Sequence, residues 1–132
     1  MENSIIGLPI HRKWTLVAQG ENSGIKDKRL LCITGEAEWQ EFWKEHTSWL
    51  VSAPPALPTV DIDREVVVAI FAGSYSSGGY AVSIEKVEDY EQTVAVTYKV
   101  IGKGAETEAM TQPFIMVRLS TGGREVSFNQ AA

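Results

Sequence analysis

The pattern of hydrophobic and polar residues is most distinctive from Val66 to Ile84, where two apolar segments flank a connection rich in glycine and serine. Residues 66–71 are uninterruptedly apolar, too few to cross a membrane and too β-branched to favour a helix. This pattern predicts a strand buried on both faces at the centre of a sheet. The alternating segment after the connection predicts a second strand, and we expect the two to form a β-hairpin through residues 73–79.

Other segments also have the composition of strands. Residues 14–19 and 29–33 are apolar and are separated by a polar loop, so either a hairpin or a crossover connects them. A break in alternation predicts a β-bulge near Lys86, and residues 93–101 alternate over their whole length. After a loop, residues 113–120 and 124–128 are predicted to form a closing strand pair around Gly122 and Gly123.

One segment predicts a helix, with Thr34 as its cap and acidic residues in its first turn. Aromatic residues recur on one face with helical spacing, at positions 39, 42, 43 and 46. We interpret this face as core rather than as a platform that stacks on a ligand. His46 falls at the end of the helix, where a cation would be stabilised by the carbonyl groups.

A proline-rich segment follows, and its prolines at 54, 55 and 58 predict an extended connector. Such a connector either wraps the edge of the sheet or carries contacts. Asp61 and Asp63 lie two residues apart in it, and we favour two solvated carboxylates over a calcium site because no DxDxDG loop is present.

With 132 residues, the chain fits one domain, residues 1–132, of which 1–13 are expected to be a flexible leader. The predicted fold is α+β: a mainly antiparallel twisted β-sheet of about six to seven strands, with one amphipathic helix packed on it.

Charge and composition exclude several function classes. Seventeen acidic against twelve basic residues give a net charge of −5, which disfavours binding to nucleic acid. Cys32 is the single cysteine, so no disulfide within the chain is possible, and its apolar neighbours predict a small buried hydrophobe. The two histidines have no spacing typical of a zinc site, and we expect neither a metal nor a cofactor.

No motif for catalysis is evident either. The serines near Gly73 lack the GxSxG spacing of a hydrolase elbow, and the lysine between Gly102 and Gly104 lacks that of a phosphate loop. The N-terminal segment shows neither a secretion signal nor a lipobox cysteine. The compartment stays open: the cell envelope or the exterior if a signal sequence was trimmed, the cytoplasm if Met1 is the native start.

A series of short motifs nevertheless resembles the PrcB C-terminal domain family. The motifs are SGI (23–25), EWQEFW (38–43), PTVDIDREVVVAIFAG (58–73), SSGGYAVSIEKV (76–87) and TQPFIMVRL (111–119), and they cover most of the chain in this order. Ile62 departs from the aromatic residue expected at that position. The resemblance implies a non-catalytic accessory subunit that stabilises a bacterial surface or secreted protease complex.

The resemblance thus implies a protein partner, such as a protease, and no catalytic residues. The candidate partner-binding residues lie in the glycine-rich connection: Tyr75, Ser76, Ser77, Gly78 and Gly79. Tyr75 either is an exposed anchor or folds back over the neighbouring apolar face. The alternative is a module that binds a small ligand or a glycan through exposed tryptophans, at positions 14, 39, 43 or 49.

Overall fold

The computed structural model describes residues 10–104 and 109–132 of the chain. Within these residues it contains eight strands and one helix. In chain order they are β1 (Ile10–His11), β2 (Thr15–Gly20), β3 (Lys28–Ile33), α1 (Glu36–Thr47), β4 (Val66–Ala72), β5 (Tyr80–Asp89), β6 (Thr93–Gly102), β7 (Phe114–Leu119) and β8 (Glu125–Gln130).

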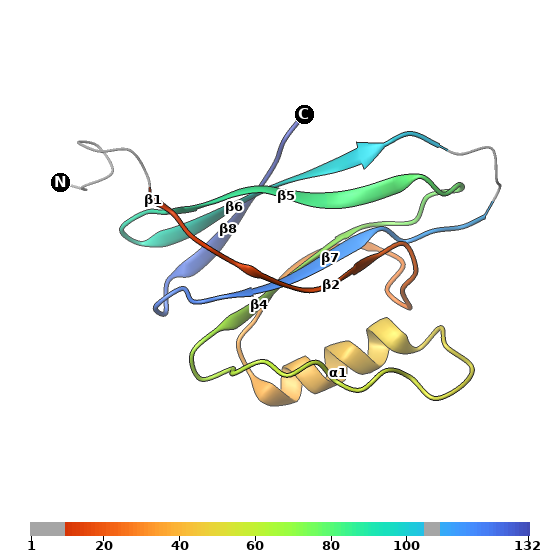
Figure 1. Ribbon diagram of the computed structural model, residues 1–132, viewed down its shortest axis with the longest axis horizontal. Coiled ribbons are helices and arrows are strands. Elements are labelled where there is room, and N and C mark those ends of the chain that lie inside the picture. The colour runs from red at the N-terminus through yellow and green to blue at the C-terminus, as the bar shows by residue number, and fades with distance from the viewer. Residues whose placement is uncertain (1–9, 105–108) are drawn as a thin grey trace.

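The strands form two stacked sheets, and the helix makes a third layer (Figure 1). Sheet A has the order β1-β5-β6-β8, and sheet B has the order β2-β7-β4-β3. All pairs are antiparallel except β6 with β8, which are parallel. The predicted α+β class, mainly antiparallel with one packed helix, is confirmed, but the strands divide between two sheets rather than one.

Strand β4 occupies the central position that its apolar run predicts. It lies between β3 and β7, and its residues from Val67 to Phe71 are buried. Alternate side chains face opposite layers, because successive residues of a strand point to opposite sides of the sheet. Val68 and Ile70 belong to the core between the sheets, whereas Val67 and Phe71 belong to the core beneath the helix.

The predicted hairpin between β4 and β5 is wrong. β5 pairs with β1 and β6, and the connection 73–79 carries the chain from sheet B to sheet A. The two strands meet through side chains instead of backbone hydrogen bonds, since Val68 and Ile70 share one hydrophobic cluster with Val82 and Ile84. Strands that stack face to face in two sheets can bury as much apolar surface as strands paired in one sheet, so the fold is stabilised in either arrangement.

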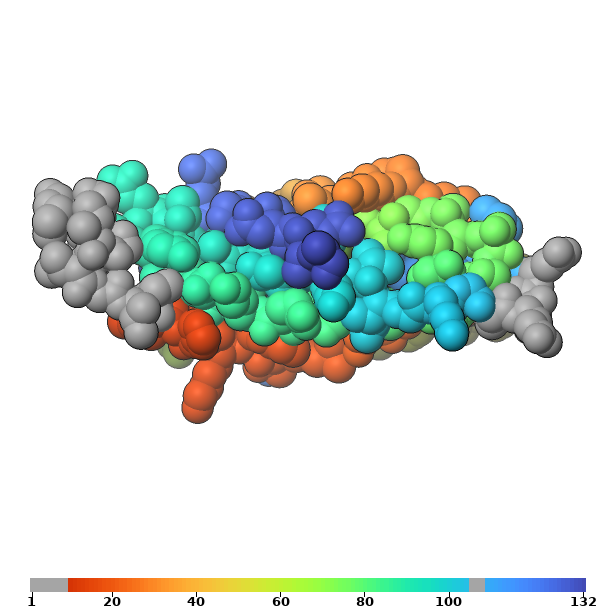
Figure 2. All heavy atoms as spheres, turned by 90° about the horizontal axis from the view of Figure 1, so that it is seen from above, coloured from red at the N-terminus to blue at the C-terminus, as the bar shows by residue number. Residues whose placement is uncertain are grey.

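The predicted closing pair at the C-terminal end is also wrong, because β8 leaves β7 and pairs with β6 in the other sheet. The segments 14–19 and 29–33 are joined by a crossover rather than a hairpin, because β2 and β3 lie at opposite edges of sheet B. In Figure 2, the red-orange residues of β2 and the orange residues of β3 lie on opposite sides of the molecule. The bulge near Lys86 is confirmed by a register shift between Ile84 and Lys86. The alternating strand at 93–101 is confirmed as β6.

Helix α1 packs its aromatic face on sheet B, as predicted. Trp39, Phe42 and His46 are buried. Its N-cap is Gly35 without a side-chain hydrogen bond, so the predicted cap at Thr34 is wrong. The backbone N–H of Thr34 instead donates to the carboxylate of Glu38, at 3.4 Å.

The proline-rich connector runs back along the helix. The indole N–H groups of Trp39 and Trp43 donate to the carbonyl oxygens of Pro58 and Pro55, at 3.2 and 3.0 Å. Three connector side chains, Leu57, Val60 and Ile62, pack against the cluster beneath the helix. The connector therefore covers one flank of α1.

The segment expected to be a leader is described only from residue 10 onward, and residues 1–9 lie outside the described residues. Ile10–His11 pairs with β5 as β1. Arg12 follows, and its guanidinium donates to Asp89 at 2.8 Å, which ties the passage from β1 to β2 onto sheet A.

Candidate functional site

The connection 73–79, which contains the candidate partner-binding residues, is held by hydrogen bonds to the loop 21–27. Gly73 and Gly79 adopt positive φ angles of 96° and 93°, a backbone region that favours glycine. The Ser74 hydroxyl donates to the carbonyl of Lys26 at 2.8 Å, and the N–H of Gly79 donates to the carboxylate of Glu21 at 3.0 Å. Both ends of the connection are therefore fixed to the same neighbouring loop.

Tyr75 is the aromatic residue of this connection, and it is half-buried. Its backbone exchanges two hydrogen bonds with Thr111, at 2.8 and 2.9 Å. Its ring lies 4.4 Å from the ring of Tyr80, centroid to centroid, at an interplanar angle of 32°. The Tyr75 ring is thus positioned by its backbone and by an aromatic neighbour.

The other candidate residues differ in exposure. Ser76 and Gly79 are exposed, whereas Ser77 and Gly78 are half-buried. The carbonyl of Ser77 accepts a hydrogen bond from the Thr111 hydroxyl at 2.8 Å. The exposed surface of the connection is therefore a backbone turn with small polar side chains beside one tyrosine ring.

A buried polar cluster lies in the neighbouring SGI loop. The Ser23 hydroxyl is 2.8 Å from Nδ1 of His46 and accepts the N–H of Ile25 at 2.9 Å. The N–H of Ser23 donates to the side-chain amide of Gln112 at 3.3 Å, and the N–H of Gly24 donates to the carbonyl of His46 at 2.8 Å. Loop, helix end and the segment preceding β7 are therefore joined at one point.

The prediction that His46 is a cation at the helix end is wrong. His46 is 5% exposed, and its ring contacts those of Phe71 and Phe114, with centroids 5.9 and 4.5 Å away. Burial lowers the pKa of His46 to about 4, because a charged imidazolium loses its hydration there. The ring is neutral at pH 7, and its position is set by packing rather than by the helix dipole.

Ser23 and His46 have the composition of a nucleophile and its base, but the geometry is closed. Ser23 is 1% exposed, and its oxygen already accepts a backbone N–H. A hydrolytic pair needs space for a reacting carbonyl about 3 Å from the nucleophile. The pair as placed fixes the SGI loop to α1 and offers no approach to a substrate.

The four tryptophans do not form a common platform. Trp39 is fully buried and Trp43 is half-buried, with both indole N–H groups bonded to the connector. Trp14 and Trp49 are exposed but precede β2 and follow α1, respectively, and no aromatic contact among the described residues joins them. Trp39 is therefore too buried to stack on a sugar, and only part of the Trp43 ring is exposed for such a contact.

The two aspartates of the connector and the single cysteine are the remaining candidates for a metal site or a reactive group. Asp61 and Asp63 are exposed, and Asp61 lies 3.6 Å from Arg64. No group of three or more metal-ligating side chains occurs within the described ranges, 10–104 and 109–132. Cys32 is half-buried rather than buried, and burial raises the pKa of its thiol.

Three residues outside the predicted set also organise the site: Glu21, Thr111 and Gln112. Glu21 accepts Gly79 through its side chain and the N–H of Gln112 through its carbonyl, at 2.6 Å for the latter. Their positions are fixed by contacts between segments far apart in the chain, which no spacing pattern encodes. The occurrence of Thr111 and Gln112 in the TQP motif was the available signal.

Comparison with known proteins gives one match. Residues 66–120 match the family model described as PrcB C-terminal. A search of curated proteins and a search of solved structures each found no match to the chain. Helix α1, the one helix of the described residues, is not long and apolar enough to span a membrane. The predicted resemblance to the PrcB C-terminal family is therefore confirmed over residues 66–120, from β4 through β7.

Proposed function

We propose that this protein is a non-enzymatic interaction domain that binds and stabilises a partner protein, and that the partner belongs to a bacterial surface or secreted protease complex. The observation that supports this most strongly is the match to the PrcB C-terminal family over residues 66–120. The resemblance to this family supports an accessory role for the domain. The matched segment includes the whole 73–79 connection and both strands that it joins.

The connection has properties suited to docking. Its ends are hydrogen-bonded to the 21–27 loop, and its centre is bridged to Thr111. A surface that is already ordered loses little conformational entropy on binding, so more of the contact energy contributes to affinity. Tyr75 supplies an aromatic ring with a polar tip, which is a common anchor in protein interfaces.

The test is capture of partners from the native host with the wild type and with the variants Tyr75→Ala and Tyr75→Phe. The alanine variant removes the ring, whereas the phenylalanine variant keeps its packing on Tyr80 and removes only the hydroxyl. Tyr90→Ala is the matched control, because Tyr90 is also half-buried but lies in the turn between β5 and β6. Urea unfolding of every variant establishes that each one is folded.

We expect a specific partner that the wild type and Tyr90→Ala retain and that Tyr75→Ala loses. Retention by Tyr75→Phe would assign the contact to the ring. Equal capture by wild type and Tyr75→Ala would remove the connection from the proposal, and capture of no specific partner by the wild type would contradict the interaction function itself.

A further inference from the structure

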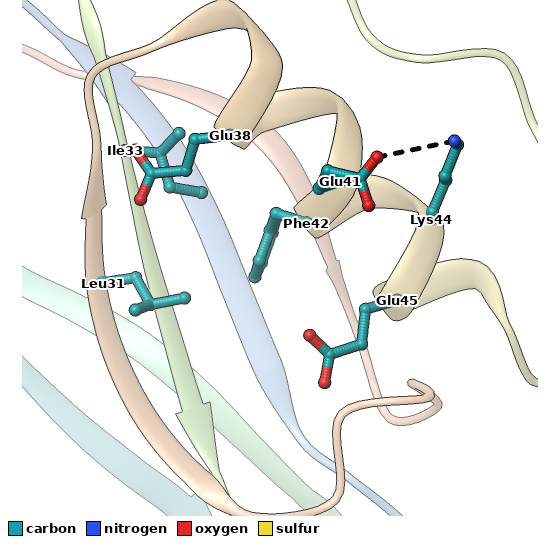
Figure 3. A pocket seen from close by; sticks show the side chains of 7 residues that line it. All are labelled: Leu31, Ile33, Glu38, Glu41, Phe42, Lys44 and Glu45. Atoms are coloured by element: carbon teal, nitrogen blue, oxygen red, sulfur yellow. Dashed lines mark ion pairs between the residues drawn. The ribbon is translucent and has the colours of Figure 1, made fainter.

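A groove lies between strand β3 and helix α1, on the side of the helix shown in Figure 3. Its volume is about 550 Å³. Leu31 and Ile33 of β3 and Phe42 of α1 form its apolar surface, and the remaining lining residues are charged residues of α1: Glu38, Glu41, Lys44 and Glu45. An apolar strip therefore runs beneath a predominantly acidic rim.

The groove lies beside a free sheet edge. β3 is the last strand of sheet B, and among the described residues its strand partner is β4 alone. Alternate backbone N–H and C=O groups of such an edge point away from the sheet and can pair with another strand. The four residues from Leu30 to Ile33 carry no charge, and Leu30 is 37% exposed. Edge strands are usually protected by charged residues or proline, and this part of β3 has neither.

The two faces of the β3 edge differ in chemistry. Leu31 and Ile33 pair with Ala69 and Val67, whose side chains belong to the core beneath the helix. Leu30 and Cys32 pair with Ile70 and Val68, whose side chains belong to the core between the sheets. A strand added to β3 would therefore place its side chains alternately on two surfaces. One set would face the acidic groove beside α1, and the other would lie beside Leu30 and Cys32, on the side of the core between the sheets.

The charges of the groove favour a basic occupant. Three carboxylates and one lysine line it, a formal balance of −2. Arg29 already lies at one end, where its two terminal nitrogens donate to Glu45 at 2.9 Å each. Glu41 and Lys44 form an exposed ion pair at 3.6 Å, and such a pair contributes little free energy because water screens it. Glu38 and Glu41 are thus the carboxylates that a second cation would meet.

We propose that an extended segment of a partner protein adds to the free edge of β3, with lysine or arginine residues facing α1 and apolar residues at the intervening positions. The aliphatic stem of a lysine or arginine covers Leu31 and Phe42, while its charged end reaches the carboxylates. Main-chain hydrogen bonds supply affinity, and the alternating pockets supply sequence preference. The inference rests on the proposed function in that the domain binds a protein, and it adds a surface separate from Tyr75.

A second copy of the chain fits this edge less well. Pairing of two β3 edges would bring two acidic grooves together, and like charges across an interface oppose association. Self-association through β3 is therefore an outcome that would overturn the proposal.

The experiment uses a short capped peptide in which lysine and valine alternate, added to the isotopically labelled full chain. Two peptides serve as controls: one in which glutamate replaces lysine, and one with the lysine sequence but alternate backbone nitrogens methylated. The methylated peptide keeps every charge and loses the donors needed for strand pairing. The protein variants are E38Q/E41Q and, as a matched control with the same change in net charge, E85Q/E91Q, whose glutamates are exposed on sheet A and in its β5–β6 turn.

We expect the lysine peptide to shift and protect the amides of β3, and the glutamate and methylated peptides to bind more weakly. E38Q/E41Q should weaken binding by about fivefold, the size expected for two partly exposed charge pairs, whereas E85Q/E91Q should leave it unchanged. Equal binding of the methylated peptide, equal affinity of E38Q/E41Q, or amide shifts elsewhere than β3 and α1 would overturn the proposal. Each result is independent of partner capture through Tyr75, so failure of one does not imply failure of the other.

Discussion

The Ser23 hydroxyl lies 2.8 Å from Nδ1 of His46, and both side chains are buried. The serine oxygen also accepts the N–H of Ile25, so this one hydroxyl contacts both the loop backbone and the imidazole. This hydrogen bond joins the SGI loop to the C-terminal end of α1. The SGI motif is part of the loop 21–27, to which the 73–79 connection is hydrogen-bonded.

Replacing Ser23 with alanine should lower the free energy of unfolding by about 1–3 kcal/mol, because the N–H of Ile25 and Nδ1 of His46 would lose their buried partner. Urea unfolding at pH 7 measures this. The exposed Ser76→Ala is the matched control and should change stability by less than about 0.5 kcal/mol. Equal stability of the two variants would show that the buried contact contributes nothing.

Stability should fall as the pH falls from about 6.5 to about 4. The pKa of His46 is lowered from 6.5 to about 4 in the folded state, so the unfolded chain binds more protons in this window and protonation favours unfolding. The difference corresponds to a loss on the order of 3 kcal/mol, complete near pH 4. Urea unfolding across this range, compared with His46→Gln, measures the contribution. Profiles that run parallel for the two proteins would contradict it.

Gly24 should tolerate no side chain. A Cβ at this position would overlap the carbonyl oxygen of Glu45 and the hydroxyl of Ser48 at the end of α1. Gly24→Ala should therefore destabilise the protein by more than about 2 kcal/mol, as expected for overpacking against a backbone atom. Gly78→Ala is the control, since its nearest contact would be an ordinary 3.5 Å to Glu21. Thermal unfolding compares them, and equal melting temperatures would refute the close approach.

Asp89 should stabilise the passage from β1 to β2. Its carboxylate lies 2.8 Å from Arg12 and 3.1 Å from Arg124. The hydrogen bond from Arg12 is the main reason that the pKa of Asp89 is lowered, so its stabilisation is present above the ordinary pKa of an aspartate and is lost as the pH falls through the lower, folded value. Asp89→Asn should cost about 1 kcal/mol at pH 7 in urea unfolding. A cost that persists undiminished at pH 2 would argue for a packing effect instead.

Local pattern predicted which residues would be buried more reliably than which strands would pair. The apolar run of β4 and the alternation of β6 report burial directly. The pairing of β5 does not follow from them, because a connection of this length can join neighbours in one sheet or strands in two stacked sheets. Packing of Val68 against the β5 face decides between them, and that contact is tertiary.

The site was harder to predict for the same reason. Helical spacing placed His46 on the buried face, but its neutral state depends on Phe71 and Phe114, which come from β4 and β7. The candidate residues of the 73–79 connection were visible as a glycine-rich segment. Their anchoring to Glu21 and Thr111 required the folded chain, since these residues lie tens of positions away.

The most direct test of the accessory function is the thermal unfolding of the captured partner with and without this domain. Binding that is restricted to the folded partner stabilises it by about 2.7 kcal/mol when the domain is present at about 100 times its dissociation constant. We predict that the wild-type domain raises the partner's melting temperature by several degrees and that Tyr75→Ala raises it less. An unchanged melting temperature at saturating wild-type domain would contradict the account.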